Sequence, residues 1–587
     1  MRRIFPLGTR GPNGPLATIA ARYHKHIPAV VAIGLVASIL EGVGIGLFLP
    51  LLVLMMDDAP ATGGLPEPAQ DLAATFGGLA SQSQFLVIGA ALLVLIVIKG
   101  LVQTGNATLI GWLTGLIGRD VRSALSAKIL ALDYDFFLRH DVDRLHQVIS
   151  ADSWHVTDVA REALSTIPAF VALLIFGAFL AWLDWRLFAA VVIGTAIIRA
   201  WLYVVERRLE RLSFEVTDSN HRLGEQMFAV VTSMRVIRVF DQQEREQAGF
   251  EGLAERVRKA MFRRQGTSAW IAPGVEVLTS LLFILILFLG YRLGVSLAEI
   301  VAFVLLLVRA QSYARTISEA RVTISSVRGS VEEVEWLLDY ENRPAAAIAG
   351  ALPPGGLPVR FDQVSFIYPG DRLALSEASF ELRPGVVTAL IGRSGSGKST
   401  VVNLLCRLIE PETGVITVGD TDMAEIPARQ WRGRLAIAGQ DIELVDGTIA
   451  ENIAYGKPDA THEEIELAAR TAGCEGFLGN LPAGFETRVG HGGARLSGGQ
   501  RQRIGIARAL VRRPEILILD EAINAVDSIS EAEILKLLTE HRHFHTALVV
   551  SHRRSTLAIC QDCIVLDHGR VVESGPLDAS SYYLSML

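Results

Sequence analysis

Apolar residues dominate roughly the first 320 positions of the chain and form six long runs. A bilayer is crossed by about 20 predominantly apolar residues. A single run of this kind could be a buried helix of a soluble protein, but six in one half of a chain favour membrane-spanning helices. The first run starts too far into the chain and is too long for a cleaved signal peptide. The six predicted spans are 27–56, 85–113, 164–183, 187–205, 270–289 and 297–308.

Charge predicts how these spans are oriented. The segment before the first span has basic and no acidic residues: Arg2, Arg3, Arg10, Arg22 and Lys25. The loop 57–83 has acidic and no basic residues: Asp57, Asp58, Glu67 and Asp71. By the positive-inside rule the N-terminus is cytosolic, and six crossings return the chain to the cytosol. We therefore predict a multi-pass protein of the cytoplasmic (inner) membrane, with both termini in the cytosol.

Five polar residues fall within the predicted spans: Glu41, Lys99, Asn106, Arg199 and Glu276. A charge at the middle of a membrane helix costs about 2.5–3.5 kcal/mol on insertion scales. Such residues should therefore face the interior of the bundle or a wet cavity, and Glu41 with Lys99 is a possible pair. They either line a substrate cavity or join helices structurally. Arg199 is expected to extend its side chain towards the cytosolic end of its helix.

A second domain begins near residue 359, after a Pro-, Gly- and Ala-rich linker at 341–358. Its short β-rich runs alternate with helical patterns, which predicts a largely parallel sheet covered by helices. The predicted strand 387–391 is followed by the loop Gly392-Arg-Ser-Gly-Ser-Gly-Lys-Ser399 and a helix from Thr400. In this context the loop is a phosphate-binding loop, in which Lys398 reaches the β- and γ-phosphates and Ser399 ligates Mg²⁺.

A second predicted strand, 516–520, ends in Asp520-Glu521. An acidic pair at a strand end is more often merely solvated. Next to a phosphate loop, however, Asp520 is placed to hold Mg²⁺ and Glu521 to polarise an attacking water. The pair therefore favours hydrolysis over simple nucleotide binding.

The segment Leu496-Ser-Gly-Gly-Gln500 opens a further helix, and with the loop, the Asp-Glu pair and a later histidine it resembles the ATP-binding cassette of ABC transporters. A six-helix membrane domain before one cassette resembles an exporter-type half-transporter. The resemblance implies an all-α six-helix membrane domain followed by an α/β P-loop NTPase domain. The expected divisions are 1–26 (cytosolic segment), 27–340 (membrane domain), 341–358 (linker) and 359–587 (cassette).

The resemblance also implies roles for individual residues. Glu521, His552 and Gln440 would be catalytic, and Ser399, Gln440 and Asp520 would hold Mg²⁺. Tyr368 would stack on adenine, with an ordinary strand aromatic as the alternative. The residues expected to contact ATP are Tyr368, Gly392, Ser394, Gly395, Gly397, Lys398, Ser399, Thr400, Ser497, Gly498, Gly499, Gln500 and Asp527.

In this family the LSGGQ segment closes on the nucleotide of a second cassette. This chain has one cassette, so we expect a dimer: a homodimer is simplest because all its own motifs are intact, and a heterodimer stays possible.

The cytosolic extensions at 119–161 and 206–264 are expected to meet the cassettes around 133–143 and 217–223. The segment 487–493 departs from the usual acidic residue and arginine before LSGGQ, and the stretch after His552 has arginine where leucine is frequent. Neither departure touches a phosphate ligand.

The remaining composition narrows the function. Fifty-five Lys and Arg against 62 Asp and Glu give a net charge of −7, which excludes a nucleic-acid-coating protein. Four cysteines in 587 residues make no disulfide framework. Cys560 and Cys563 could suggest a metal or redox pair, but without a second pair burial is the better interpretation.

The substrate is constrained least. The small-residue stretch Leu40-Glu-Gly-Val-Gly-Ile-Gly46 resembles the first helix of exporters of lipid-linked saccharides or glycolipids, although such spacing also serves close helix packing. We predict ATP-driven export of an amphipathic molecule such as a lipid, with membrane lipid as a partner. Peptide or drug export and an ATP-gated channel or regulator are alternatives. An importer subunit is disfavoured because its domains are usually separate chains.

Overall fold

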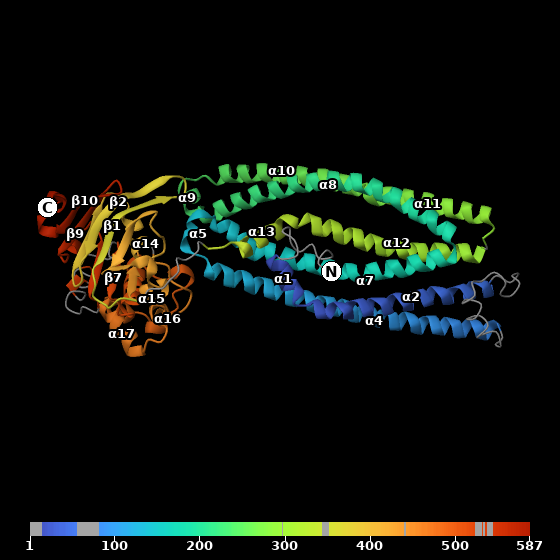
Figure 1. The fold of residues 1–587 in the computed structure, drawn as a ribbon, viewed down its shortest axis with the longest axis horizontal. Coiled ribbons are helices and arrows are strands. Elements are labelled where there is room, and N and C mark those ends of the chain that lie inside the picture. The colour runs from blue at the N-terminus through green and yellow to red at the C-terminus, as the bar shows by residue number, and fades with distance from the viewer. Residues whose placement is uncertain are drawn as a thin grey trace. The chain divides into compact units, whose positions relative to one another are not determined.

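The computed structural model describes residues 14–55, 81–295, 297–342, 352–439, 442–522, 531, 535–536 and 544–586 (Figure 1). The chain divides into two compact units, which are described separately. The first comprises Met1–Ala131 and Val142–Tyr340, and the second comprises Leu132–Asp141 and Glu341–Leu587. Half of the predicted linker 341–358 lies outside the described residues, which omit 343–351.

The first unit is a bundle of long helices, and among its described residues six are long and apolar enough to cross a membrane. Within the described residues, each of the six predicted spans therefore falls on one of these helices, except that Trp270 precedes α11. The helices are α1 (Pro15–Ala21), η1 (His24–His26), α2 (Ile27–Met55), α4 (Ser81–Ala131), α6 (Val142–Gln147), η2 (Val148–Asp152), α7 (Ser153–Leu183), α8 (Trp185–Thr232), α9 (Met234–Val239), α10 (Gln243–Ala269), α11 (Ile271–Leu293), α12 (Leu297–Ser326) and α13 (Arg328–Asp339).

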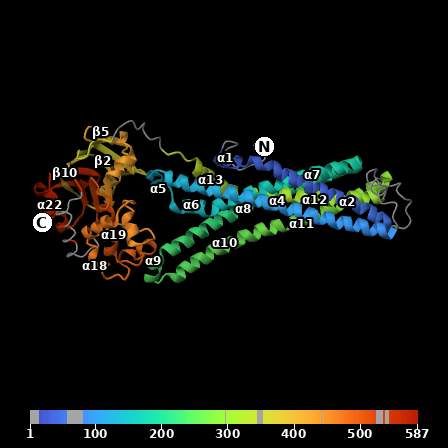
Figure 2. The same ribbon diagram turned by 90° about the horizontal axis from the view of Figure 1, so that it is seen from below.

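Helix α7 is the centre of this bundle, since it packs against α2, α4 and α12. Phe176 of α7 and Phe303 of α12 are fully buried in one apolar cluster. In contrast, apolar residues such as Leu93 and Leu101 of α4 are 67% and 70% exposed, as lipid-facing side chains should be. Helices α8 and α10 lie side by side along much of their length (Figure 2).

Two of the predicted polar residues in the membrane helices form the expected pair. The Nζ atom of Lys99 lies 3.0 Å from Oε2 of Glu41, between α4 and α2. The same carboxylate is reached from α12 by Nε of Arg309 at 3.3 Å. Arg199 forms a two-point ion pair with Glu206 at 2.9 and 3.2 Å. Its side chain thus extends along α8 towards the helix extension, as predicted.

The second unit contains two sheets. The predicted, largely parallel sheet is present with strand order β10-β9-β3-β8-β7-β6, in which only β10 is antiparallel. The sequence did not predict the other sheet, which has the order β2-β1-β4-β5 and is antiparallel throughout. The strands are β1 (Val359–Tyr368), β2 (Arg372–Leu382), β3 (Val387–Gly392), β4 (Thr413–Val418), β5 (Thr421–Asp422), β6 (Leu435–Ala438), β7 (Ile516–Asp520), β8 (Thr546–Val550), β9 (Asp562–Asp567) and β10 (Arg570–Pro576).

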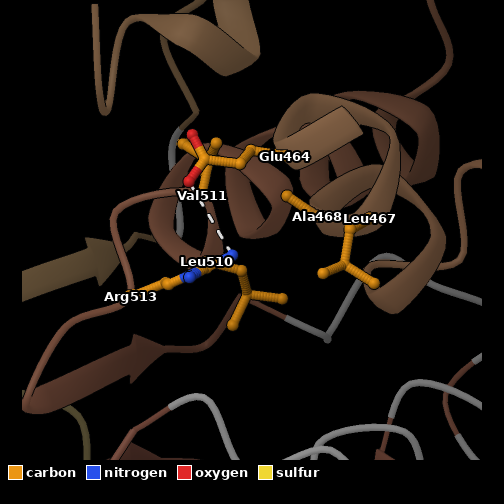
Figure 3. Close-up of a pocket in the computed structure, with 6 residues that line it drawn as sticks. All are labelled: Glu464, Leu467, Ala468, Leu510, Val511 and Arg513. Atoms are coloured by element: carbon orange, nitrogen blue, oxygen red, sulfur yellow. Dashed lines mark ion pairs between the residues drawn. The ribbon is translucent and has the colours of Figure 1, made fainter. Parts of the chain in front are cut away.

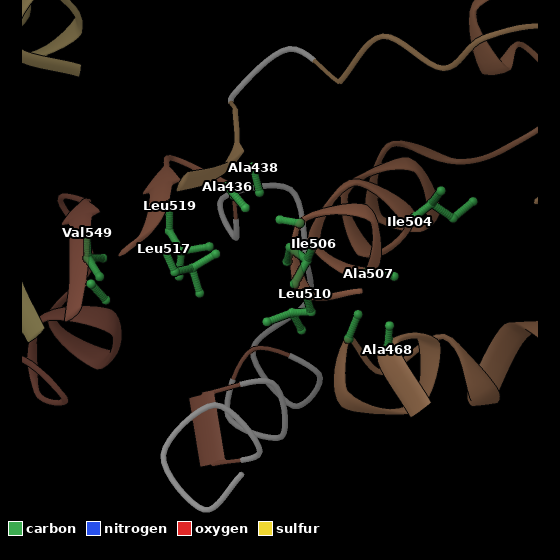
Figure 4. Close-up of a cluster of buried hydrophobic side chains, with 14 of the residues drawn as sticks. Ala436, Ala438, Ala468, Ile504, Ile506, Ala507, Leu510, Leu517, Leu519 and Val549 are labelled. Carbon is green, nitrogen blue, oxygen red and sulfur yellow. The ribbon is translucent and has the colours of Figure 1, made fainter. Parts of the chain in front are cut away.

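Helices cover the parallel sheet and bury its apolar strands. Side chains of β6, β7 and β8 meet Ile506 and Leu510 of α19 and Ala468 of α17 in one buried cluster (Figure 4). The helices of this unit are α5 (Tyr134–Arg139), α14 (Lys398–Leu405), α15 (Ala428–Gly433), α16 (Ile449–Ala454), α17 (His462–Thr471), α18 (Glu475–Leu478), α19 (Gly498–Leu510), α21 (Arg554–Leu557) and α22 (Ser581–Met586). Single helical turns are η3 (Met423–Glu425), η4 (Gly484–Glu486), η5 (His491–Gly493) and η6 (Leu577–Ala579).

Helix α5 groups with the second unit although it follows the long α4 of the first. Leu138 of α5 packs against the apolar cluster between the two sheets, and the amide N–H of Asp133 donates to the side-chain oxygen of Asn342 at 3.4 Å. Of the predicted contact region 133–143, residues up to Asp141 therefore group with the second unit, and Val142 and Asp143 group with the first. The other predicted contact region, 217–223, lies within α8 of the first unit.

The four cysteines, Cys406, Cys474, Cys560 and Cys563, are free and buried. Burial raises the pKa of the Cys560 thiol to about 12 and also raises that of Cys563. Neither thiol is thus a good nucleophile or metal ligand at neutral pH. Among the described residues no cluster of His, Cys, Asp and Glu could hold a metal by itself.

Candidate nucleotide site

The phosphate loop connects β3 to α14, as the sequence predicts. Two of its glycines are required by close packing. A Cβ on Gly392, at φ 156°, would lie 2.3 Å from the carbonyl oxygen of Leu566, and one on Gly397, at φ 106°, would lie 2.5 Å from that of Ala374. The loop is thus wedged between β9 and β2, with its backbone held at the N-terminal end of α14.

Lys398 is the first residue of α14, and only 8% of it is exposed. Its Nζ donates hydrogen bonds to the carbonyl oxygens of Gly392 at 2.8 Å and Arg393 at 2.9 Å. Burial lowers the pKa of this amine, while the carboxylates of Glu521 and Asp520 oppose that shift. The ammonium group therefore lies over the loop and within electrostatic range of both acids.

Asp520 and Glu521 stand at the carboxyl end of β7. Burial, followed by the charge of Glu521, raises the pKa of Asp520. The backbone of Glu521 has a left-handed conformation at φ 52°, and its N–H donates to the carbonyl oxygen of Val550 in β8 at 3.0 Å. This hydrogen bond to β8 thus fixes the position of the Glu521 backbone, from which the carboxylate extends.

His552 follows β8 and completes the cluster of titratable groups. Its Nε2 lies 3.9 Å from Oε1 of Glu521. Burial and the charge of Lys398 lower the pKa of this imidazole, although Glu521 opposes the shift. The ring is therefore neutral at neutral pH, where it can donate from one nitrogen and accept at the other. Thus the fold brings together Lys398, Asp520, Glu521 and His552 from three separate segments.

These residues suit Mg²⁺ bound together with nucleotide phosphates. Such sites use one or two carboxylates or hydroxyls, and phosphate oxygens and water complete the octahedron. Asp520 is a half-buried carboxylate whose ionised form is disfavoured, so a nearby cation would relieve it. Ser399, the second residue of α14, belongs to the same phosphate loop.

Tyr368 ends β1 and is half-buried. Its ring meets that of Phe366 edge to face at 4.9 Å, and its hydroxyl accepts a hydrogen bond from the Thr400 hydroxyl at 3.4 Å. Thr400 itself is buried in the first turn of α14. Tyr368, on the antiparallel sheet, thus contacts α14, the helix that follows the phosphate loop. The sequence did not predict this contact.

The LSGGQ segment caps α19. The side chain of Ser497 accepts the N–H of Gln500 at 3.3 Å, and the side-chain oxygen of Gln500 accepts the N–H of Ser497 at 2.8 Å. This reciprocal capping box leaves the N–H groups of Gly498 and Gly499 at the open end of the helix. Of the predicted site residues, Gln440 and Asp527 lie outside the described residues.

The two departures from the family pattern have defined surroundings. In segment 487–493, Thr487 and Val489 form backbone hydrogen bonds at 3.0 and 2.9 Å to Ile449 and Gly447 around the start of α16. Arg553 pairs at 2.5 Å with Glu531, a glutamate only 2% exposed that also accepts from Ser555 and Thr556. Sequence reasoning missed Glu531, because a glutamate in a helical stretch gives no signal of burial.

A surface pocket elsewhere in this unit has no residue in common with the nucleotide site. It lies between α17 and the C-terminal end of α19, where Glu464 pairs with Arg513 at 3.7 Å (Figure 3). Glu464 also pairs with Lys457 at 2.7 Å. This pocket therefore contains an ion-pair network whose acidic group already has two basic partners.

Comparisons with known proteins find similarity in both units of the chain. Residues 375–524 match the family model described as ABC transporter, and residues 31–308 match the ABC transporter transmembrane region. The ATP-dependent lipid A-core flippase of Chromobacterium violaceum is 32% identical over 88% of this chain and 89% of its own length. That of Thiobacillus denitrificans is 31% identical over 82% and 85%. The solved structure of a bacterial Atm1-family ABC exporter with ATP bound has the same fold, with a TM-score of 0.82, 24% identity and coverage of 97% of this chain and 98% of the other.

Proposed function

This chain belongs to the ABC transporter family, as an exporter-type membrane protein with an ATPase cassette, and from that premise we propose that it flips a lipid with a saccharide-bearing head group across the inner membrane. The relatives named above are lipid A-core flippases, and they resemble this chain over more than four fifths of its length. Their names support a lipid substrate over the peptide, drug and channel alternatives.

We assign the chemistry of ATP cleavage to the cluster at the ends of β3, β7 and β8. Mg²⁺ held by Ser399 and Asp520, with Gln440 as a further expected ligand, would neutralise phosphate charge when bound. Glu521 accepts a proton from the water whose oxygen attacks the γ-phosphorus, and the bond from that phosphorus to the bridging oxygen of ADP breaks. Neutral His552, whose Nε2 lies 3.9 Å from Oε1 of Glu521, is proposed to form a hydrogen bond with the γ-phosphate.

Binding of nucleotide requires Lys398 to exchange its present partners. Its two hydrogen bonds to loop carbonyls at 2.8 and 2.9 Å hold the ammonium group at the loop before phosphate arrives. Phosphate oxygens would replace these carbonyls as stronger, charged acceptors. Ser394, Gly395 and the other loop residues supply backbone N–H groups. Tyr368 is proposed to stack on the adenine.

The active form is proposed to be a homodimer. Ser497 and the N–H groups of Gly498 and Gly499 would contact the γ-phosphate on the partner's cassette, together with Asp527 at the interface. The capping box supports this because it keeps the N-terminal end of α19 ordered and its amide groups available to an anion. Both chain termini are proposed to face the cytosol.

The observation that carries the proposal is the grouping of Lys398, Asp520, Glu521 and His552 in a chain related to flippases. The test is ATP hydrolysis and lipid translocation by the purified protein in proteoliposomes, with lipid A-core and with ordinary phospholipid as probes. Lipid A-core should stimulate ATPase activity and cross the bilayer only with ATP. Translocation of peptide or ion flux far above ATP turnover, without lipid movement, would overturn the proposal.

A further inference from the structure

A charged contact joins two short helices of the membrane unit that are far apart in the sequence. Nε of Arg144, on α6, donates to Oε2 of Glu333, on α13, at 2.9 Å, and its Nη2 donates to Oε1 at 3.0 Å. The same guanidinium lies over the ring of Trp336, 4.2 Å from its centroid. We call these three residues the Arg144 clamp. Two parallel hydrogen bonds with an aromatic contact define one orientation of the guanidinium.

The helices that the Arg144 clamp joins follow, in the chain, α5, which groups with the cassette, and α12, the last membrane helix. Helix α6 begins at Val142, three residues after α5 ends at Arg139, and α5 groups with the cassette fold through Leu138. Helix α13 begins two residues after α12 ends and precedes the linker to the cassette. The clamp therefore joins α6, which follows α5 in the chain, to α13, which follows α12, the last membrane helix.

A second contact lies about two helical turns beyond Arg144 in the chain. Asp152 ends η2, a π-helical turn that follows α6 directly, and only 4% of it is exposed. The side chain of Ser330, on α13, lies beside its carboxylate. A π turn in a long helix often marks a functional position. Both contacts connect the stretch from α6 to η2 with one side of α13.

Stability alone does not account for the clamp. The side chains of Arg144 and Glu333 are 47% and 38% exposed. Exposed ion pairs contribute little to the free energy of folding, even though this one is bidentate. The Arg144 guanidinium has a well-defined orientation but adds little stability. Its contacts therefore fit a role in setting the position of α6 relative to α13 better than a role in stabilising the fold.

We propose that Arg144 is a positioning residue of the transport cycle, which transmits displacement of α5 to α12 through Glu333 and Trp336. When nucleotide moves the cassette, α5 moves with it, and α6 follows as the next segment of the chain. The clamp makes α13, and with it α12, follow that movement. Without the clamp, the cassettes still hydrolyse ATP, but the membrane helices respond to it less. The inference rests on the proposed lipid transport.

The test compares lipid moved with ATP consumed. Wild-type protein and the variants Arg144→Ala, Glu333→Ala and the double variant are placed in proteoliposomes with a fluorescent head-group-labelled lipid A probe. We expect ATPase activity within about twofold of wild type and lipid moved per ATP lower by about fivefold in each variant. The double variant should be no worse than either single variant, because both remove the same contact.

Arg328→Ala is the matched control. Arg328 lies on the same α13 and pairs with Glu332 at 2.9 Å, but within one helix, so lipid moved per ATP should stay at the wild-type value. Glu333→Gln keeps the size of the side chain and repeats the test if Arg144→Ala does not fold. Wild-type coupling in Arg144→Ala or Glu333→Gln, multiplied losses in the double variant, or equal loss of ATPase and transport would each overturn the clamp. Absence of lipid movement in the wild type would instead overturn the proposed substrate.

Discussion

The hydroxyl of Tyr313 on α12 donates a hydrogen bond to the carboxylate of Glu41 on α2 at 2.6 Å. Lys99 of α4 and Arg309 of α12 approach the same carboxylate at 3.0 and 3.3 Å. Glu41 is only 6% exposed, so a single buried acid is shared by three membrane helices. The sequence predicted its pairing with Lys99, while the two partners on α12 come from the fold.

Replacing Glu41 should destabilise the membrane unit. The variant Glu41→Gln leaves Lys99 and Arg309 without their anion; because these side chains are 19% and 54% exposed, the cost should lie below the value of about 3–5 kcal/mol for a fully buried pair. Tyr313→Phe removes only one hydrogen bond to a charged group and should cost less, about 1.5–3 kcal/mol. Thermal unfolding in detergent micelles measures both. A Glu41→Gln protein as stable as the wild type would show that the cluster contributes no net stability.

Glu521→Gln and Lys398→Ala should both abolish ATP hydrolysis, for different reasons. Loss of a general base lowers a rate by about 10²–10⁴-fold, so Glu521→Gln should bind ATP yet barely cleave it. Lys398→Ala should weaken ATP binding itself. Glu515→Gln is the control, because Glu515 precedes the same strand but pairs with Arg434 at 3.4 Å. Phosphate release and nucleotide-binding assays separate the outcomes, and full turnover by Glu521→Gln would contradict the assigned role.

Asp520→Asn should stabilise the nucleotide-free cassette while removing its ATPase activity. Burial and Glu521 raise the pKa of Asp520 in the folded state. A raised carboxyl pKa means that its contribution to stability is fully present below the unfolded-state pKa and is lost as the pH rises through the folded-state pKa. At pH 7 the aspartate is therefore ionised at a cost that asparagine avoids.

The measurement for this variant is the unfolding midpoint without Mg²⁺ or nucleotide. A gain of about 1 kcal/mol raises the midpoint of a domain of this size by about 2–4 °C. The difference between variant and wild type should shrink as the pH is lowered below about 4, where the unfolded aspartate is protonated too. A lower midpoint for Asp520→Asn than for the wild type at pH 7 would contradict the interpretation that ionised Asp520 destabilises the nucleotide-free cassette.

Ser497→Ala should separate ATP binding from ATP hydrolysis. It removes the acceptor for the Gln500 N–H and costs about 1 kcal/mol of helix stability. Nucleotide binding at the phosphate loop of the same chain should be retained, whereas hydrolysis falls. Mixed dimers of Ser497→Ala and Lys398→Ala chains give the test: one composite site is then intact, and residual activity is expected. Activity equal to that of homodimeric Ser497→Ala protein would argue against a site shared between chains.

Thiol reagents should not modify the folded cassette at pH 8. Cys406, Cys474 and Cys560 are buried with a pKa raised to about 12, and Cys563 is 1% exposed. Only the thiolate reacts, so labelling should follow unfolding. Mass spectrometry before and after denaturation counts the modified residues. Rapid labelling of Cys560 and Cys563 in the native protein would reopen the redox interpretation.

The features that the sequence predicted correctly follow mainly from signals in contiguous residues. The six membrane helices follow from run length, and the strand–loop–helix around Lys398 follows from a contiguous motif. The antiparallel sheet was missed because β1 pairs with β4 across two intervening strands, the phosphate loop and α14, and no short-range turn predicts this pairing. Arg144 and Glu333 meet across 189 positions, and their contact depends on how two helices are rotated. No periodicity in either segment records that rotation.

The left-handed backbone of Glu521 sets two demands on this position against each other. A side chain other than glycine is strained at φ 52°, and glycine would relax the chain but carry no carboxylate. A substitution by glycine that stabilises the cassette would thus be expected to remove its ATPase activity. An acid at this position therefore costs the fold some stability, and glycine would avoid that cost only by removing the carboxylate proposed as the general base.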